Sequence, residues 1–150
     1  MRLKKISQKK NLTFYSVDSS VNLEVPLFNS STSAGFPSPA DDYIEMKLDL
    51  NRHVIKNIDA TYYVRVNGDS MKDAMINDGA LLVVDRSINP SDNSIAVCSI
   101  NGEFTVKRII IKEKEIYLKP ENDKYNLIKV SEFDDFLVWG IVTYVIQKPL

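Results

Sequence analysis

The chain has few of the side chains on which most hydrolases and metal sites depend. Its 150 residues include one histidine, His53, and one cysteine, Cys98. One residue of each kind cannot supply the ligands of a zinc site, and a lone cysteine has no partner for an internal disulfide. A glycine-rich phosphate loop is absent too. We therefore expect no metal and no cofactor, and a Ser-His or Cys-His hydrolase would have to be built around a single residue.

Long apolar runs are also missing. No segment approaches the ~20 apolar residues of a membrane-spanning helix, and polar residues follow the basic start of the chain where a secretory signal would be apolar. Cys98 lies in the short apolar run 94–100, so we expect a small core residue rather than a reactive thiol. These features predict a cytoplasmic protein that makes no membrane contact.

The charge is nearly balanced overall but unevenly placed. The net charge is −1, so the chain as a whole has no footprint for nucleic acid. Residues 1–34 carry five basic and two acidic side chains, whereas residues 35–150 carry fourteen and eighteen. This basic start predicts a solvated, flexible N-terminal arm. A weak electrostatic contact with an acidic partner is the alternative.

The rest of the chain has the composition of one folded domain, with 44% apolar residues. Runs of β-forming residues bounded by turn signals predict a compact, mainly β and mostly antiparallel domain after Ala60. The expected strands are 61–66, 80–84, 95–100, 103–111, 115–118, 127–130 and 136–146, with a tight hairpin turn at Asn101-Gly102.

One short helix is expected before these strands. Leu50, Val54 and Ile58 form an apolar stripe at helical spacing within residues 49–58, and Asp49 is a suitable N-cap. His53 lies on this helix, and we expect it at the surface or in packing contacts.

Ser70 and Lys107 are the most informative pair in the chain. A serine hydroxyl needs a base to become a good nucleophile, and lysine is a base only when burial lowers its pKa. If residues 103–111 form a strand, Lys107 shares one face with Thr105 while Arg108 is on the other. Gly68 allows a tight turn before Ser70, whose N–H groups can hold an oxyanion, a contribution of roughly 3–4 kcal/mol per donor in hydrolases.

Taken alone, each residue of the pair has an ordinary explanation. Ser70 fits a turn or helix-cap serine, and a lone lysine in a strand is usually exposed. The bond Ala34–Gly35 adds weight, because Pro37 and Pro39 favour extended backbone beside it, the shape that peptidases bind. An ordinary linker would have a similar composition.

Four segments together are similar to the LexA/UmuD family of self-cleaving Ser-Lys peptidases. They are residues 34–42, the turn Asn67-Gly68-Asp69-Ser70-Met71, the run Asp78-Gly79-Ala80-Leu81-Leu82-Val83-Val84-Asp85, and Asn101-Gly102-Glu103-Phe104-Thr105-Val106-Lys107-Arg108. The similarity extends over about residues 25–147. The combination is far more specific than Gly-Asp-Ser-Met alone.

This resemblance implies a β-rich peptidase domain over 35–150 and an arm over 1–34 that self-cleavage removes at Ala34–Gly35. Ser70 would be the nucleophile, Lys107 the general base, and the backbone N–H groups of Asp69 and Ser70 the oxyanion hole. It also implies a homodimer, stimulation by a RecA filament on single-stranded DNA in the SOS response, and a trimmed form that serves a UmuC-type translesion DNA polymerase. The best-known member of the family has a cysteine in place of Ala34 and a shorter, less basic arm.

Other functions stay open at this point. Residues 1–34 have too little apolar periodicity for the helix-turn-helix domain of LexA-type repressors, so we expect no direct sequence-specific DNA binding. Bacterial signal peptidases apply Ser-Lys chemistry to other proteins, although from a membrane anchor not seen in this sequence. A pure binding module with a vestigial dyad is the remaining alternative.

Overall fold

The computed structural model describes residues 2–18, 20, 22–28 and 44–150. The strands are β1 (Arg2–Lys9), β2 (Leu12–Asp18), β3 (Glu24–Phe28), β4 (Ile44–Asp49), β5 (Thr61–Val66), β6 (Leu81–Asp85), β7 (Ile95–Ile100), β8 (Glu103–Lys112), β9 (Glu115–Lys119), β10 (Ile128–Lys129) and β11 (Phe136–Ile146). The described helical segments are α1 (Leu50–Val54) and the 3-10 turns η2 (Ile58–Ala60) and η3 (Lys72–Ala74).

Nine strands form one sheet in the order β1-β2-β5-β6-β11-β7-β8-β9-β10, and its neighbours pair antiparallel. The mainly β, antiparallel prediction is confirmed, and the seven expected strands are found within one residue at each end. The turn at Asn101-Gly102 also has the expected form, because both residues have positive φ, 50° and 82°.

Strand β11 connects the two halves of this sheet. One end of β11 pairs with β6 and the other with β7, and both pairings contain an irregularity that lets the strand bend. Gly140 lies at the bend, where an added Cβ would be 2.6 Å from Cγ1 of Val84. A larger residue there would have to displace the Val84 side chain of β6, so glycine favours the close packing at this bend.

The main core lies between the two halves of the bent sheet. Buried side chains of β2, β5 and β6 meet Val97 of β7 and Val106 of β8 in one cluster. Burial of each large apolar side chain contributes about 1.5–3 kcal/mol. This packing brings the loop that follows β5 against β8 and so places residues far apart in the sequence in one site.

The N-terminal segment differs from the flexible arm expected from its charge. Residues 2–18 form the β1–β2 hairpin, and β2 pairs with β5 as an internal strand of the sheet. Leu12 and Phe14 are 2% and 4% exposed and belong to the main core. The lysines misled the prediction because they lie on the edge strand β1 and in the turn after it, where charged side chains face solvent and discourage pairing with other chains.

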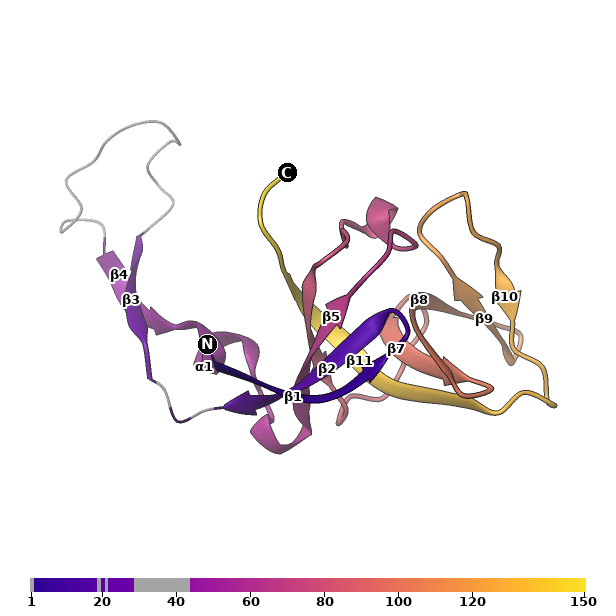
Figure 1. The fold of residues 1–150 in the computed structure, drawn as a ribbon, viewed down its shortest axis with the longest axis horizontal. Coiled ribbons are helices and arrows are strands. Elements are labelled where there is room, and N and C mark those ends of the chain that lie inside the picture. The colour runs from indigo at the N-terminus through magenta and orange to yellow at the C-terminus, as the bar shows by residue number, and fades with distance from the viewer. Residues whose placement is uncertain (1, 19, 21, 29–43) are drawn as a thin grey trace.

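Strands β3 and β4 form a separate two-stranded ribbon. Figure 1 shows this ribbon projecting from one end of the molecule, away from the main sheet. Leu23, Val25 and Leu27 are 62%, 54% and 36% exposed. The ribbon therefore gains little from burial, although it follows directly after the well-packed hairpin in the chain.

Helix α1 is shorter than predicted. Asp49 caps it, because its carboxylate accepts a hydrogen bond of 3.0 Å from the Asn51 N–H, as expected. The helix ends at Val54, and Ile58 begins the separate turn η2. None of the described helices is long and apolar enough to cross a membrane.

Candidate functional site

Ser70 lies in the turn of residues 67–71 that follows β5, here called the Ser70 turn. Gly68 has a φ of 117°, a conformation that favours glycine. The Gly68 N–H donates to Oδ1 of Asp78 at 2.8 Å, and the Asn67 N–H donates to the carbonyl of Asn11 at 2.9 Å. Met71, 1% exposed, anchors the turn in the main core. The position of Ser70 is thus set by the backbone on one side and by core packing on the other.

Lys107 reaches this turn from β8. Its Nζ is 3.3 Å from Oγ of Ser70, 2.5 Å from Oγ1 of Thr105 and 3.1 Å from the carbonyl oxygen of Val106. Thr105 is on the same face of β8, as the alternation of a strand requires. Thr105 and Val106 therefore hold the amine at hydrogen-bonding distance from the serine hydroxyl.

The surroundings of Lys107 disfavour its charged form. The residue is 7% exposed, and none of the ion pairs among the described residues involves it. Burial lowers the pKa of Lys107 below its ordinary value, whereas a Cys98 thiolate would raise it. Burial also raises the pKa of Cys98 to about 12, so the thiol stays protonated and supplies no charge at lower pH. Desolvation therefore dominates, and it favours a neutral amine.

A small hollow opens over the pair. It has a volume of about 100 Å³ and is lined by the Ser70 turn, by Thr105 and Lys107 of β8, and by Leu12 and Tyr125. Tyr125 also borders a wider hollow of about 860 Å³ on the side of β8 and β9. Both Ser70 and Lys107 line the hollow, but Ser70 is half-buried whereas Lys107 is 7% exposed, so the serine is the more accessible of the two.

A second segment, residues 121–125, clamps the Ser70 turn from outside. The Asn122 side chain, in a residue 3% exposed, donates to the Asp69 carbonyl at 2.8 Å. The Tyr125 hydroxyl donates to Oδ1 of Asp69 at 2.6 Å, and this bond is the main cause that lowers the pKa of Asp69. The Asp73 N–H donates to the Glu121 carbonyl at 2.8 Å. Residues on both sides of Ser70 are thus tied to this clamp segment.

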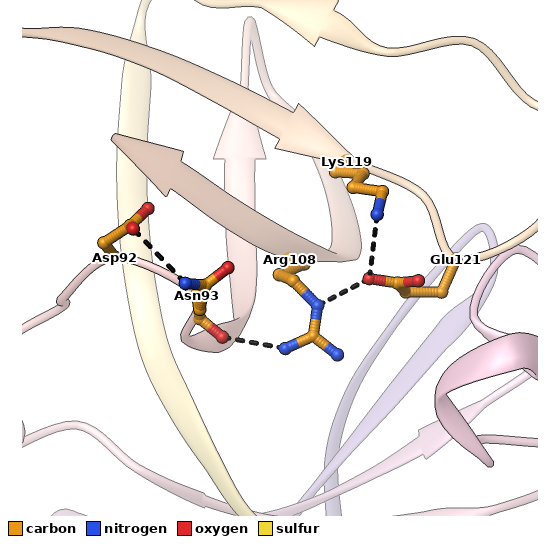
Figure 2. Close-up of polar contacts among 5 residues, drawn as sticks. All are labelled: Asp92, Asn93, Arg108, Lys119 and Glu121. Carbon is orange, nitrogen blue, oxygen red and sulfur yellow. Dashed lines mark hydrogen bonds and ion pairs between the residues drawn. The ribbon is translucent and has the colours of Figure 1, made fainter. Parts of the chain in front are cut away.

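Arg108 fixes the clamp segment to β8, as Figure 2 shows. Its Nε is 2.5 Å from Oε1 of Glu121, and its Nη1 donates to the Asn93 carbonyl at 2.9 Å. Lys119 adds a longer ion pair to Glu121 at 3.7 Å. Arg108 projects from the opposite face of β8 to Lys107. Two adjacent residues of one strand thus have different roles, since Lys107 is the candidate base and Arg108 holds the clamp segment.

The structure places the predicted site residues unequally. Ser70, Lys107 and Asp69 come together, whereas Ala34 and Gly35 lie outside the described residues. His53 is exposed on α1 and packs beside Tyr144, with ring centroids 6.1 Å apart. No group of three or more His, Cys, Asp or Glu side chains in the described part of the chain could hold a metal ion.

Sequence reasoning missed three contributors to the site. The contact of Thr105 with Lys107 could have been found, because the alternation already put both on one face. Asn122 and Tyr125 gave no local signal, since their partner Asp69 is 53 and 56 residues away. Such contacts depend on the bend of the sheet and cannot be read from a local pattern.

A serine hydroxyl beside a buried, unpaired lysine is an arrangement typical of serine peptidases that use lysine as their base. Comparison with known proteins agrees with this class. The family model described as Peptidase S24-like matches residues 26–143. The chain belongs to the Peptidase S24-like family.

Relatives of known name place the chain more closely. It is 39% identical to protein MucA of Salmonella typhimurium over 128 residues, which are 84% of this chain and 87% of that protein. It is 42% identical to protein SamA of Salmonella typhimurium strain LT2 over 128 residues, 85% of this chain and 89% of that protein. LexA repressor 2 of Pseudomonas syringae is 33% identical over 126 residues, 84% of this chain but 61% of the repressor. The resemblance to the LexA/UmuD family is confirmed.

Proposed function

We propose that this chain is a peptidase that cuts its own Ala34–Gly35 bond, with Ser70 as nucleophile and Lys107 as general base. The observation that carries the proposal is the 3.3 Å distance between Lys107 Nζ and Ser70 Oγ. It is supported by the burial of the amine and by the absence of an ion pair to it among the described residues.

In the first step, neutral Lys107 accepts the hydroxyl proton of Ser70 as Oγ attacks the carbonyl carbon of Ala34. The N–H groups of Asp69 and Ser70 then donate to the oxyanion, for which the Ser70 N–H has no competing acceptor among the described residues. The ammonium of Lys107 returns the proton to the departing amine of Gly35. Water hydrolyses the acyl-serine, which leaves a carboxylate on Ala34 and restores the serine.

The small size of the hollow over Ser70 supports this choice of bond. A space of about 100 Å³ suits a residue with a small side chain, and Ala34 and Gly35 are both small. The bond also lies in sequence between β3 and β4, the exposed ribbon.

The biological setting of the proposal comes from the family resemblance. The uncut chain would act as a homodimer and would be stimulated by a RecA filament on single-stranded DNA during the SOS response. The trimmed form would serve a UmuC-type translesion DNA polymerase as an accessory subunit.

Intact-mass analysis tests the self-cleavage. The purified wild-type chain is incubated at about pH 7.5 and about pH 10, with and without RecA filaments formed on single-stranded DNA and nucleotide. We expect a fragment that begins at Gly35 in wild type and none in Ser70→Ala or Lys107→Ala. Ser99→Ala and Lys112→Ala are matched controls outside the site and should cleave like wild type.

Other results would support different functions. A Gly35 fragment from Ser70→Ala would rule out Ser70 as the nucleophile. Turnover of an added Ala-Gly peptide at a rate above self-cleavage would favour a peptidase that acts on other proteins. No fragment from wild type under any condition would favour a binding module with an inactive dyad.

A further inference from the structure

We infer that the hairpin of residues 2–18 stays bound to the peptidase domain after cleavage, so that the cut protein is a non-covalent complex of 1–34 and 35–150. The inference rests on the proposed function for the cut itself. The site it assigns is the edge of β5, and the occupant of that site is β2 of the same chain.

One face of β2 is built into the main core. Leu12 and Phe14 are 2% and 4% exposed. The Phe14 ring makes edge contacts with Phe104, at a centroid distance of 5.5 Å, and with Trp139, at 4.8 Å. Phe104 lies on β8 and Trp139 on β11. Removal of β2 would therefore open a cavity between β8 and β11 of the domain that remains.

The other face of the hairpin packs in a second cluster. Leu3, Tyr15 and Val17 contact a group of buried residues that includes Tyr63 and Val83. Side chains on both faces of β2 are therefore packed against the domain, while β1 forms the exposed edge of the sheet.

Backbone pairing adds a directional component to this packing. Strand β2 pairs with β5 in continuous register from Leu12 opposite Val66 to Ser16 opposite Tyr62. Release of the hairpin would turn β5 into an unpaired edge next to the main core. It would also remove the carbonyl of Asn11 that accepts from the Asn67 N–H in the Ser70 turn. None of these contacts involves the Ala34–Gly35 bond that is cut.

The ribbon is the element that cleavage changes. The proposed cut falls between β3 and β4 in sequence, so β3 belongs to the 1–34 fragment and β4 to the 35–150 fragment. These two strands are held mainly by their mutual pairing, and the side chains of Leu23, Val25 and Leu27 are largely exposed. After cleavage, β3 is held to the 35–150 fragment mainly by this pairing, at the end of a fragment that remains anchored by β2.

The hairpin also lies outside the part of the chain matched by the family model, residues 26–143. Retention of the fragment is thus a property argued for this chain from its own contacts. The family match carries no information about it.

The test separates retention from self-cleavage by making the cut with an added enzyme. The recognition sequence of a site-specific protease is inserted between Ala34 and Gly35 in full-length Ser70→Ala protein. After the cut is verified by mass in denaturant, the sample is run on size-exclusion chromatography under native conditions. We expect both fragments to elute together and to separate only in denaturant. Elution of the 1–34 fragment alone would overturn the inference, whatever the result for self-cleavage.

Variants of the hairpin sharpen the result. Phe14→Ala should release the fragment at least about 100-fold faster than the parent, because truncation of a buried phenylalanine leaves a large cavity. Phe14→Leu is a milder change. This variant should fold, and it should release the fragment more slowly than Phe14→Ala does. Ile6→Ala, on β1 with Ile6 54% exposed, is the matched control and should retain the fragment. Equal release from Ile6→Ala and Phe14→Ala would contradict a role for core packing.

Discussion

The Ser70–Lys107 pair and the β3–β4 ribbon have opposite surroundings. Ser70 and Lys107 are supported from several sides, by the core below, the clamp segment outside and the hairpin at one end. The ribbon that flanks the proposed cleavage bond in sequence has exposed apolar side chains and packs chiefly on itself. The Ser70–Lys107 pair is pre-organised, whereas the ribbon has little buried surface to hold it in a single position.

This difference explains how a peptidase can carry its own substrate without immediate loss of that substrate. A rigid site supplies the orientation that accelerates chemistry, while delivery of the bond into the site can be a separate, weakly biased step. A stimulating partner then needs to act only on delivery. The predictions below test the rigid side and the exposed side against each other.

The largest expected effect is at the buried base. Lys107→Met keeps the length of the side chain but removes the amine, so self-cleavage should fall by about 10²–10⁴-fold. The free energy of unfolding should be within about 1 kcal/mol of wild type or above it, because an apolar side chain replaces a desolvated amine. Thermal unfolding and intact mass check the two parts. Loss of both stability and cleavage would mean that Lys107 is structural.

The next prediction compares the hairpin with the ribbon directly. In a Ser70→Ala background, Phe14→Ala should lower the free energy of unfolding by about 3–5 kcal/mol, as for other buried phenylalanines. Val25→Ala on the exposed β3 should change it by no more than about 0.5 kcal/mol. Urea denaturation measures both. Similar losses for the two variants would show that the ribbon is as well packed as the hairpin.

The sequence predicted the C-terminal two thirds of this fold closely, and the reasons are local. Strands β5 to β11 alternate or are continuously apolar, and most of the connections between them contain glycine or proline. The alternation on β8 correctly separated Lys107 from Arg108, which contact different segments in the structure. Local pattern was enough to locate each of these strands, including β11, but it did not show that β11 pairs with both β6 and β7.

The hairpin was missed because its evidence is split between two signals. The lysines of β1 indicated a solvated terminus, yet residues 12–17 read Leu-Thr-Phe-Tyr-Ser-Val, rich in β-forming side chains after the Lys10-Asn11 turn. Strand β5, with which β2 pairs, begins roughly 40 residues after β2 ends, beyond the reach of a local pattern. The clamp segment was missed for the same reason, since only the folded sheet brings Asn122 to Asp69.

The pH dependence of cleavage tests the desolvated state of the base. Burial lowers the pKa of Lys107, and only the neutral amine is active. The rate should therefore rise by about tenfold per pH unit below the folded pKa and level off above it, at a pH lower than for an exposed lysine.

The free energy of unfolding should also depend on pH because the pKa of Lys107 differs between the folded and unfolded chain. Between the folded pKa and the higher unfolded pKa, the unfolded chain binds more protons, so the free energy of unfolding of wild type should rise with pH relative to Lys107→Met. Rate measurements by intact mass and urea titrations across the range check both trends. A cleavage rate that is flat while chemistry is limiting would exclude Lys107 as the base.

The smallest predicted effect is at the clamp segment. Asn122→Ala removes the donor to the Asp69 carbonyl and loosens the turn that carries Ser70, so self-cleavage should slow by about 10–100-fold. Asn126→Ala, at an exposed position of the same loop, is the matched control and should cleave normally. Since a positioning role acts on the geometry of the serine and leaves the base unchanged, the pH at which the rate levels off should be the same in Asn122→Ala as in wild type. A shift of that pH would show that Asn122 acts on Lys107, and an unchanged rate would show that the core alone positions the Ser70 turn.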